Sequence, residues 1–453
     1  MTVFASHLRS SGSSAYIIFL ATIVAISGFL LGFDTAIING VLLILRSQLA
    51  LSNFATQAAG GALLLGCLLG AASASLVGDR FGRRNSLLLS ALLFLASTAA
   101  TAMAGSIMVF SLGRLASGIA IGLASVLTPV YIAEVAPAHS RGRLVSMNQL
   151  AVVTGILIAY LVGWRLASWG ADSWRWMVGI AVLPGAVFLL GLLAIPESPR
   201  WLIGHGQGRK GREILARIFT PEEAEEQAAL IESASTGQVA TWAEVFARPM
   251  HKALVVALGL AILCQITGVN AVLYYGSILI TEHLHGQSTS SALAASVFIG
   301  SANLLVTLLA MRFIDRWGRR TMLLTAAGGM SVSLLLLVAA FSMPAAPTML
   351  LLVSILGYIG FFAFGMGPVP WVVISEIFPN RVRGRAASVA TSALWAGALL
   401  VTLTFLSLIR SLGVAGTFAV CASLSVFSFV FIWKLVPETR GKTLEQIQQE
   451  WRA

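Results

Sequence analysis

The chain carries the loop Gly78-Asp79-Arg80-Phe81-Gly82-Arg83-Arg84 and carries it again as Ile314-Asp315-Arg316-Trp317-Gly318-Arg319-Arg320. Two further charged signatures return in the same order and at nearly the same offset of about 240 residues. Chance similarity between apolar segments would not repeat charged loops in one order, so the sequence predicts a duplication into two halves. The two further signatures are EVAP with RGR at 134–143, which returns as EIFP with RGR at 376–385, and PESPR at 196–200, which returns as PETR at 437–440.

The composition indicates a membrane protein with many spans. Of the 453 residues, 57% are hydrophobic and 10% are charged, whereas ordinary soluble domains are roughly 25% charged. The mean hydropathy is +0.88. A soluble protein of this length would form about three domains, and this composition excludes that arrangement. The three cysteines, Cys67, Cys264 and Cys421, all lie in apolar stretches, so no disulfide framework, metal site or cofactor is expected.

Twelve apolar segments are long enough to cross a bilayer, whose hydrocarbon core requires roughly 20 helical residues. The first is too long for the core of a signal peptide and lacks a small-residue cleavage site, so we expect it to remain as a span. The predicted fold class is therefore an all-α membrane protein with twelve transmembrane helices in two six-helix, pseudo-symmetric halves. The segments lie near residues 16–45, 55–77, 86–104, 107–133, 144–167, 174–195, 253–281, 291–311, 321–342, 348–375, 386–409 and 415–434.

The net charge of +11 is an orientation signal and does not indicate nucleic-acid binding. With twelve spans both chain ends lie on one side, and most of the 29 Lys and Arg residues fall in the tails and loops of that side. Positive charge marks the cytoplasmic side of a membrane protein, so both termini are expected in the cytoplasm. The few basic residues expected on the opposite side are Arg46, Arg165, Arg175 and Arg410.

A polar linker joins the two halves. Within it, Thr220-Pro221-Glu222-Glu223 is typical of a helix start, with a capping Thr, Pro in the first turn and Glu three residues after the cap. We expect a short cytoplasmic helical connector, with a regulatory or partner-binding role as the alternative. The predicted divisions are a first half at 1–195, the linker at 196–250, a second half at 251–436 and a cytoplasmic tail at 437–453.

Two parallel six-helix repeats describe the major facilitator architecture. On the signatures above, together with Gly32-Phe33-Asp34-Thr35 and the tail 437–445, nearly the whole chain resembles the sugar porters of that superfamily. It is most similar in pattern to bacterial proton-coupled monosaccharide symporters. The resemblance implies transport by alternating access, with a sugar bound between the halves near the midplane of the bilayer.

Asp34 and Arg114 are the two unambiguous charges within the predicted spans. Ionisable groups at such positions are expensive and usually functional. Counted along helices that rise about 1.5 Å per residue, both lie roughly 10 Å from the outer surface, so a pair is plausible. The resemblance implies that Asp34 is a proton-coupling site, paired with Arg114 while ionised and released when protonated. A fixed structural ion pair is the alternative.

Sugar recognition needs hydroxyl-binding groups beside an apolar platform, because a sugar has hydroxyls around its ring and apolar C–H faces. The glycine between two candidate amides, Gly268, would permit local unwinding of its helix. Hydrogen bonding between helices is the alternative for any single amide. The resemblance implies substrate contacts by Gln149, Gln265, Asn270, Tyr274 and Trp371, with Asn303 and Trp395 as neighbours.

The chain also departs from the family pattern. Cys264 and Leu394 stand where relatives often carry Gln, and Leu31 replaces a Phe. The lost polar contacts leave the identity of the sugar open among xylose, glucose, galactose, arabinose and inositol.

The family resemblance implies that the charged loop residues form a cytoplasmic gate that closes the inner face. Solvated loop charges contribute little individually, so single members can equally serve orientation alone. The expected gate residues are Asp79, Arg80, Arg83, Arg84, Glu134, Arg141, Glu197, Arg200, Asp315, Arg319, Arg320, Glu376 and Arg383.

A proton-coupled sugar importer is thus the predicted function, and a sugar uniporter or exchanger of the same fold is the first alternative. A transporter-like sugar receptor would need a longer cytoplasmic extension, and a drug antiporter would need a Gly-Pro signature that residues 150–166 lack. No His cluster, nucleophile triad or phosphate-binding loop indicates an enzyme. Compact loops favour a bacterial cytoplasmic membrane. The expected partners are the monosaccharide and membrane lipid, and the chain is expected to be monomeric.

Overall fold

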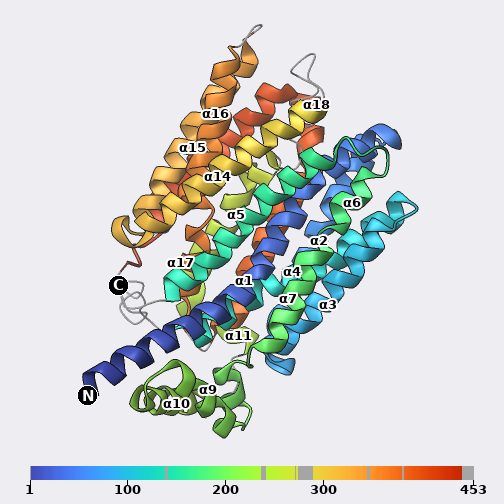
Figure 1. Cartoon of the computed structure of the whole chain (residues 1–453). Helices are drawn as coiled ribbons and strands as arrows, with labels where there is room; N and C mark the ends of the chain where they lie inside the picture. The colour runs from blue at the N-terminus through green and yellow to red at the C-terminus, as the bar shows by residue number, and fades with distance from the viewer. Residues whose placement is uncertain are drawn as a thin grey trace.

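A computed structural model describes residues 2–137, 141–235, 241–270, 272–273, 289–343, 347–379 and 382–440, and every element within these ranges is helical. Figure 1 shows the helices standing side by side in one long bundle, with a small helical cluster at one end. The elements are α1 (Thr2–Gln48), α2 (Asn53–Phe81), α3 (Arg83–Ala102), α4 (Ile107–Val135), α5 (Arg141–Leu166), α6 (Ser173–Gly179), α7 (Val182–Ala194), α8 (Pro199–Gly204), α9 (Gly208–Ile218), α10 (Pro221–Ser235), α11 (Trp242–Val245), η1 (Arg248–Met250), α12 (His251–Ile266), α14 (Thr289–Trp317), α15 (Arg319–Ser342), α16 (Thr348–Phe361), the π-helical segment η2 (Phe362–Met366), α17 (Val369–Ile377) and α18 (Arg383–Leu435).

The predicted number of spans is confirmed. Within the described ranges, 11 helical segments are long and apolar enough to cross a membrane. The last of them, α18, has 53 residues, and its helical conformation breaks at Gly413, where φ is +71°. This break divides α18 into two spans, at 383–412 and 414–435, and brings the total to twelve. Large apolar side chains such as Phe298 and Leu183 face outward, as lipid-facing residues do.

Two glycines set the sharp turns within the repeated loop. Gly82 (φ +92°) separates α2 from α3, and Gly318 (φ +87°) separates α14 from α15. Residues with a Cβ rarely adopt such positive φ values. The same loop sequence therefore produces the same one-residue turn in both halves, and this is direct structural support for the pseudo-symmetry.

Glycines also let the helices of the first half approach closely. A Cβ at Gly118 of α4 would lie 2.0 Å from the carbonyl oxygen of Leu63 in α2, and one at Gly122 would lie 2.2 Å from that of Cys67. Between α1 and α5, a Cβ at Gly32 would lie 1.9 Å from a backbone oxygen. Membrane helices pack tightly through such small residues, and this packing brings α2 against α4 and α1 against α5.

Three helices of the linker, α8–α10, form a separate cluster below the bundle in Figure 1. Ile203, Leu215, Ala228 and Ile231 share a small apolar core there. The predicted helix start is confirmed: α10 begins at Pro221, the Thr220 hydroxyl accepts from the Glu223 N–H, and the Glu223 carboxylate accepts from the Thr220 N–H. We call this side of the molecule the connector side.

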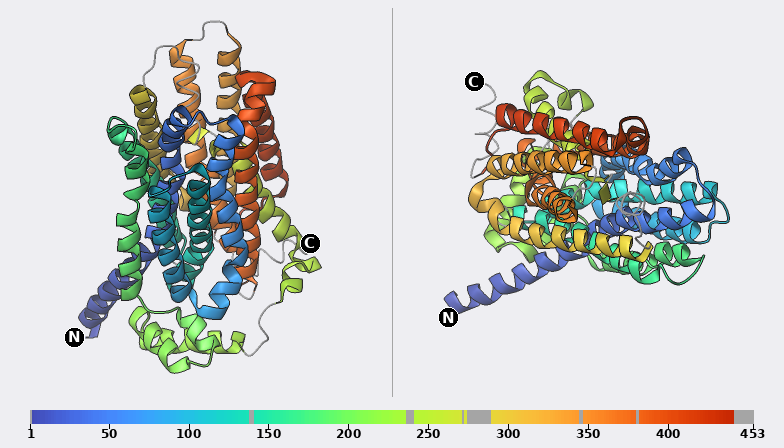
Figure 2. Two further views of the ribbon diagram at one scale, coloured as in Figure 1. Left: turned by 90° about the vertical axis from the view of Figure 1, so that its right-hand side faces the viewer. Right: turned by 90° about the horizontal axis from the view of Figure 1, so that it is seen from above.

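The two halves meet along the length of the bundle, where α2 packs against α18 and α5 against α14 (Figure 2). Hydrogen bonds cross this boundary near both ends. Asn39 Nδ2 donates to Ser296 Oγ at 3.0 Å on the side opposite the connector. The Ser75 N–H donates to Ser388 Oγ at 3.2 Å on the connector side. The halves therefore touch both above and below the middle of the bundle.

Candidate transport site

Asp34 of α1 and Arg114 of α4 form a buried ion pair in the first half. Their side chains are 2% and 1% exposed, and Arg114 Nη1 donates to Asp34 Oδ1. Arg114 Nη2 also donates to the backbone oxygen of Asp34 at 3.0 Å. The second carboxylate oxygen, Oδ2, is buried and has no hydrogen-bond partner among the described residues. The two oxygens of this carboxylate thus differ, because the arginine binds one of them and the other is unsatisfied.

The helix that carries Gln265 unwinds just after it. α12 ends at Ile266, and Gly268 has a φ of +97°. Asn270 is therefore brought back toward the end of α12, and its Nδ2 donates to Gln265 Oε1 at 2.6 Å. On an unbroken helix these two residues, five apart, would point in different directions. The unwinding at Gly268 thus joins two of the candidate sugar-binding amides.

Three of the remaining sugar candidates, Gln149, Trp371 and Trp395, are carried by elements that meet at the boundary between the halves. A Cβ at Gly367, just before α17, would lie 3.6 Å from the Gln149 amide nitrogen, so α5 meets the segment that carries Trp371. Trp395 Nε1, on α18, donates to Ser125 Oγ of α4 at 3.4 Å.

Two further candidates complete the set. Asn303 is buried in α14, and its amide oxygen accepts from Thr307 of the same helix at 3.5 Å. Tyr274 lies outside the described residues.

A cluster of charges lies on the connector side of the first half. Arg83 Nε lies 3.2 Å from Glu134 Oε2, and Arg83 Nη1 donates to Asp79 Oδ1 at 3.1 Å. Glu197 accepts from the backbone N–H groups of Arg83 and Arg84 at 2.8 and 3.0 Å. Carboxylates are favourable at this position because the first N–H groups of a helix lack partners within it.

The second half repeats this cluster with its own residues. Arg319 Nη2 donates to Glu376 Oε1 at 3.0 Å. Glu438 accepts from the backbone N–H groups of Arg319 and Arg320 at 2.9 and 3.1 Å. The Arg83–Glu134 and Arg319–Glu376 pairs each join residues of one half. A Cβ at Gly142 of α5 would lie 3.9 Å from Arg319 Nη2, so this arginine also reaches the first half.

The other predicted gate residues with described side chains are Arg80, Arg200 and Arg383. The Arg80 guanidinium stacks over Phe81, and Arg383 Nη2 donates to the backbone oxygen of Phe378. Arg200 is half-buried at the start of α8. The side chains of Arg141 and Asp315 lie outside the described part of the chain.

Sequence reasoning missed several hydroxyls that bind the candidate residues. Ser198 donates to Glu134, and Thr439 donates to Glu376 Oε2 at 2.7 Å. These two hydroxyls occupy matching positions in the PESPR and PETR signatures, so the repeat itself held the signal that could have found them. Ser125, which binds Trp395, lies in an apolar stretch without any motif, and its spacing gives no comparable signal.

Comparison with known proteins agrees with this arrangement. The family model described as "Sugar (and other) transporter" matches residues 20–451. The D-xylose-proton symporter of Escherichia coli (strain K12) is 34% identical, over 98% of this chain and 97% of that protein. The glucose transport protein of Synechocystis sp. is also 34% identical, over 98% of this chain and 99% of its own length.

Solved structures show the same fold. The proton:xylose symporter XylE bound to 6-bromo-6-deoxy-D-glucose matches with a TM-score of 0.87 at 34% identity, over 97% of this chain and all of that one. An inward-open structure of XylE from E. coli matches with a TM-score of 0.80, so the present conformation is more similar to the analogue-bound form. The family match, the identity over nearly the full length and the shared fold place this chain in the sugar porter family of the major facilitator superfamily, and it is a sugar transporter rather than an enzyme.

Proposed function

We propose that this chain imports a monosaccharide, a pentose or a hexose, together with a proton by alternating access. The observation that carries the proposal is the buried Asp34–Arg114 pair with its unpartnered carboxylate oxygen. A buried charge is tolerated when it is paired and hydrogen-bonded, and an unsatisfied anionic oxygen is unfavourable. Protonation at Asp34 Oδ2 removes that penalty and weakens the attraction to Arg114 in the same step.

Proton binding at Asp34 would be felt by the helices around it. The pair joins α1 to α4, and α4 also carries Ser125, which binds the indole of Trp395 across the boundary between the halves. A change in the attraction between α1 and α4 can therefore alter how the two halves meet beside the sugar candidates. This connection supports coupling between proton and sugar, because each ligand then favours the same arrangement of the halves.

The sugar is proposed to bind between the halves, in contact with Gln149, the Gln265–Asn270 pair and the indoles of Trp371 and Trp395. Amides supply both donors and acceptors for ring hydroxyls, and indoles offer apolar faces for C–H groups. Tyr274 and Asn303 are also proposed to contact the sugar. Relatives at the same 34% identity are named for xylose and for glucose, so the similarity to them does not indicate which sugar this chain carries.

The charge clusters on the connector side are proposed to be the cytoplasmic gate, with both termini in the cytoplasm and the chain acting as a monomer in a bacterial cytoplasmic membrane. The excess of Lys and Arg on that side supports the orientation. The domain limits proposed are 1–195, 196–250, 251–436 and 437–453. Rotation of the halves would part the contacts on one side while the other side closes.

The deciding experiment records the pH of a weakly buffered, energy-depleted suspension of expressing cells while single monosaccharides are added. We expect alkalinisation with one sugar and none in Asp34→Asn, while that variant still exchanges labelled sugar in liposomes. Asp172→Asn is the matched control, because Asp172 is an exposed carboxylate paired with Arg175 on the side opposite the connector. Exchange without any pH change in the unaltered protein would mean a uniporter or exchanger instead. Equal loss of both activities in Asp34→Asn would mean a structural pair.

A further inference from the structure

Two buried tyrosines reach the backbone on either side of Asn270. The Tyr358 hydroxyl, on α16 of the second half, donates to the backbone oxygen of Thr267 at 3.0 Å. The Tyr160 hydroxyl, on α5 of the first half, donates to the backbone oxygen of Leu273 at 3.2 Å. Tyr358 is 1% exposed and Tyr160 is 4% exposed. The stretch that carries one of the candidate sugar amides is therefore bound at both ends, and each half of the molecule supplies one of the donors.

The first of these bonds lies where α12 stops. α12 ends at Ile266, and the chain turns at Gly268 with a φ of +97°. A Cβ at Gly268 would lie 2.8 Å from Cys421 Sγ, so α18 encloses the turn. Carbonyl groups at the end of a helix lack partners within it, and a buried one needs a donor from elsewhere in the protein. The Tyr358 hydroxyl is that donor for the buried Thr267.

The course of the backbone through this turn decides how the two amides meet. Gln265 packs against α18, because a Cβ at Gly397 would lie 3.4 Å from the Cβ of Gln265. Asn270 lies beyond the turn, and its Nδ2 donates to Gln265 Oε1 at 2.6 Å. The position of Asn270 relative to Gln265 therefore depends on the stretch of backbone that the two tyrosines bind.

Tyr160 lies at the boundary between the halves, on the side opposite the connector. A Cβ at Gly300 of α14 would lie 2.9 Å from Tyr160 Cδ2, so this glycine leaves room for the tyrosine ring against the second half. One helical turn from Gly300 along α14, Ser296 accepts from Asn39 across the same boundary. Tyr160 thus contacts the second half through its ring and through its hydroxyl. A rotation that parts the halves on this side would break both contacts.

We propose that Tyr358 and Tyr160 are positioning residues of the sugar site, which hold Asn270 against Gln265 in the arrangement that binds the sugar. The inference rests on the proposed sugar site. Tyr358 and Thr267 belong to the same half, so their bond persists throughout the transport cycle. The bond from Tyr160 joins different halves and forms only while the side opposite the connector is closed. The stretch is therefore bound at both ends only once that side has closed around the sugar.

The two hydroxyls consequently have different roles. Tyr358 sets the affinity of the site, because it holds the turn in every conformation. Tyr160 stabilises the closed arrangement, because its bond is gained when the halves meet. A contact that exists in one of two conformations shifts the population toward that conformation. Loss of the Tyr160 hydroxyl should therefore open this side of the bundle more often, whereas loss of the Tyr358 hydroxyl should weaken sugar binding.

The role of Tyr358 is tested by Tyr358→Phe, which removes the hydroxyl and keeps the buried ring. We expect the KM of sugar counterflow to rise about fivefold, the effect of one neutral hydrogen bond, while the maximal rate changes less than about twofold. In an Asn270→Ala background, where the positioned amide is absent, the same change should raise the KM less than about twofold further. An unchanged KM in Tyr358→Phe, or additive effects of the two substitutions, would overturn this role.

The role of Tyr160 is tested by the opening of the side opposite the connector. Leu293 of α14 is 2% exposed, and a Cβ at Gly40 of α1 would lie 3.5 Å from Leu293 Cδ2. In Leu293→Cys a maleimide reaches the new thiol only when the halves part there, and the three native cysteines are buried. At saturating sugar, Tyr160→Phe should raise the labelling rate about fivefold, and Tyr358→Phe should change it less than about twofold. An unchanged rate in Tyr160→Phe would contradict the proposal.

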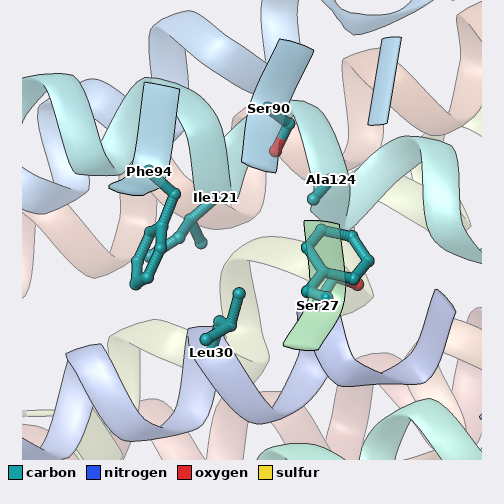
Figure 3. A pocket seen from close by; sticks show the side chains of 7 residues that line it. Ser27, Leu30, Ser90, Phe94, Ile121 and Ala124 are labelled. Atoms are coloured by element: carbon teal, nitrogen blue, oxygen red, sulfur yellow. The ribbon is translucent and has the colours of Figure 1, made fainter. Parts of the chain in front are cut away.

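The matched control is Ser90→Ala in the first half. Ser90 Oγ of α3 donates to the backbone oxygen of Ala120 in α4 at 2.7 Å, so this bond also joins two helices through a buried hydroxyl and a carbonyl group. Figure 3 shows Ser90 beside the small space among α1, α3, α4 and α7, which none of the sugar candidates lines. Ser90→Ala should leave the KM and the labelling rate unchanged. An equal response in Ser90→Ala and in the tyrosine variants would assign the effect to the loss of any buried hydroxyl and reject the positioning role.

Counterflow of labelled sugar also separates this inference from the proposed function. If the unaltered protein exchanges no monosaccharide, the proposed sugar site fails and the inference fails with it. Normal exchange, with a KM and a labelling rate that neither tyrosine variant changes, would reject only the positioning role. Elution as a single peak in size-exclusion chromatography reports that each variant is folded. Tyr160→Phe tests the contact between the halves even if Tyr358→Phe does not fold.

Discussion

Glu197 and Glu438 hold the same position in the two halves, each with its carboxylate at the start of the helix that follows the repeated loop. Glu197 accepts from the N–H groups of Arg83 and Arg84 at α3, and Glu438 accepts from those of Arg319 and Arg320 at α15. Each acidic residue comes from the segment that follows the last span of its half. The duplication thus preserved a contact between two distant parts of the chain, and not only a sequence motif.

Replacement of Gly82 should destabilise the protein more than replacement of Gly170. Both glycines have a φ of +92°, so Ala at either position would be strained by about 1–3 kcal/mol. A Cβ at Gly82 would additionally lie 2.3 Å from Glu197 Oε2, whereas nothing lies within 4 Å of one at Gly170. Thermal unfolding in detergent should give a lower Tm for Gly82→Ala than for Gly170→Ala. Equal values would show that the Glu197 carboxylate moves aside without loss.

Removal of both carboxylates of the proposed gate should slow transport without weakening sugar binding much. Glu134 and Glu376 each bind an arginine and a hydroxyl of their own half, at Arg83 and Ser198 and at Arg319 and Thr439. In Glu134→Ala plus Glu376→Ala we expect turnover to fall several-fold and the KM for sugar to change less than about twofold.

The control for this gate variant is Glu213→Ala, which breaks an exposed pair with Arg209 and should have no effect. Unchanged turnover in the double variant would count against a gate.

Replacement of Arg114 by lysine should impair sugar-driven proton uptake. The guanidinium donates to both the side chain and the backbone oxygen of Asp34, and a lysine ammonium lacks the planar fork that allows this. Arg114→Lys should therefore lower sugar-driven proton uptake at least about tenfold, the effect of one lost charge-assisted hydrogen bond. Sugar-dependent alkalinisation is the measurement. Wild-type coupling in this variant would mean that positive charge alone suffices.

Ser125 should affect sugar affinity through Trp395. Its hydroxyl accepts from the indole N–H at 3.4 Å, and loss of a neutral hydrogen bond costs about 1 kcal/mol, or roughly fivefold in affinity. Ser125→Ala should raise the KM of counterflow by about that factor. In a Trp395→Phe background, where the N–H is already gone, the same change should have little further effect. Additive effects of the two substitutions would show that the two residues act independently.

The spans and the repeated contacts were predictable because their signals are strong and local. Long apolar segments have few stable alternatives in a bilayer, and charges inside them must find partners. The break at Gly268 followed from the spacing of Gln265 and Asn270. By contrast, buried Ser and Thr residues often bond to their own helix, so a sequence does not show which of them reach a neighbour. For this reason the contact of Ser125 with Trp395 became visible only once α4 and α18 were placed together.

The connector is attached differently at its two ends. At its start, Ser198 binds Glu134 and Trp201 Nε1 donates to the backbone oxygen of Asp79 at 2.9 Å, so α8 is fixed to the first half. At its far end, Arg385 of the second half stacks over Trp242 of α11. The distance from α8 to α11 must therefore change whenever the halves rotate against each other. A pair of fluorescent dyes on α8 and α11 would report each transport cycle as a change in the distance between them. Neither the sugar nor its binding site would need a label.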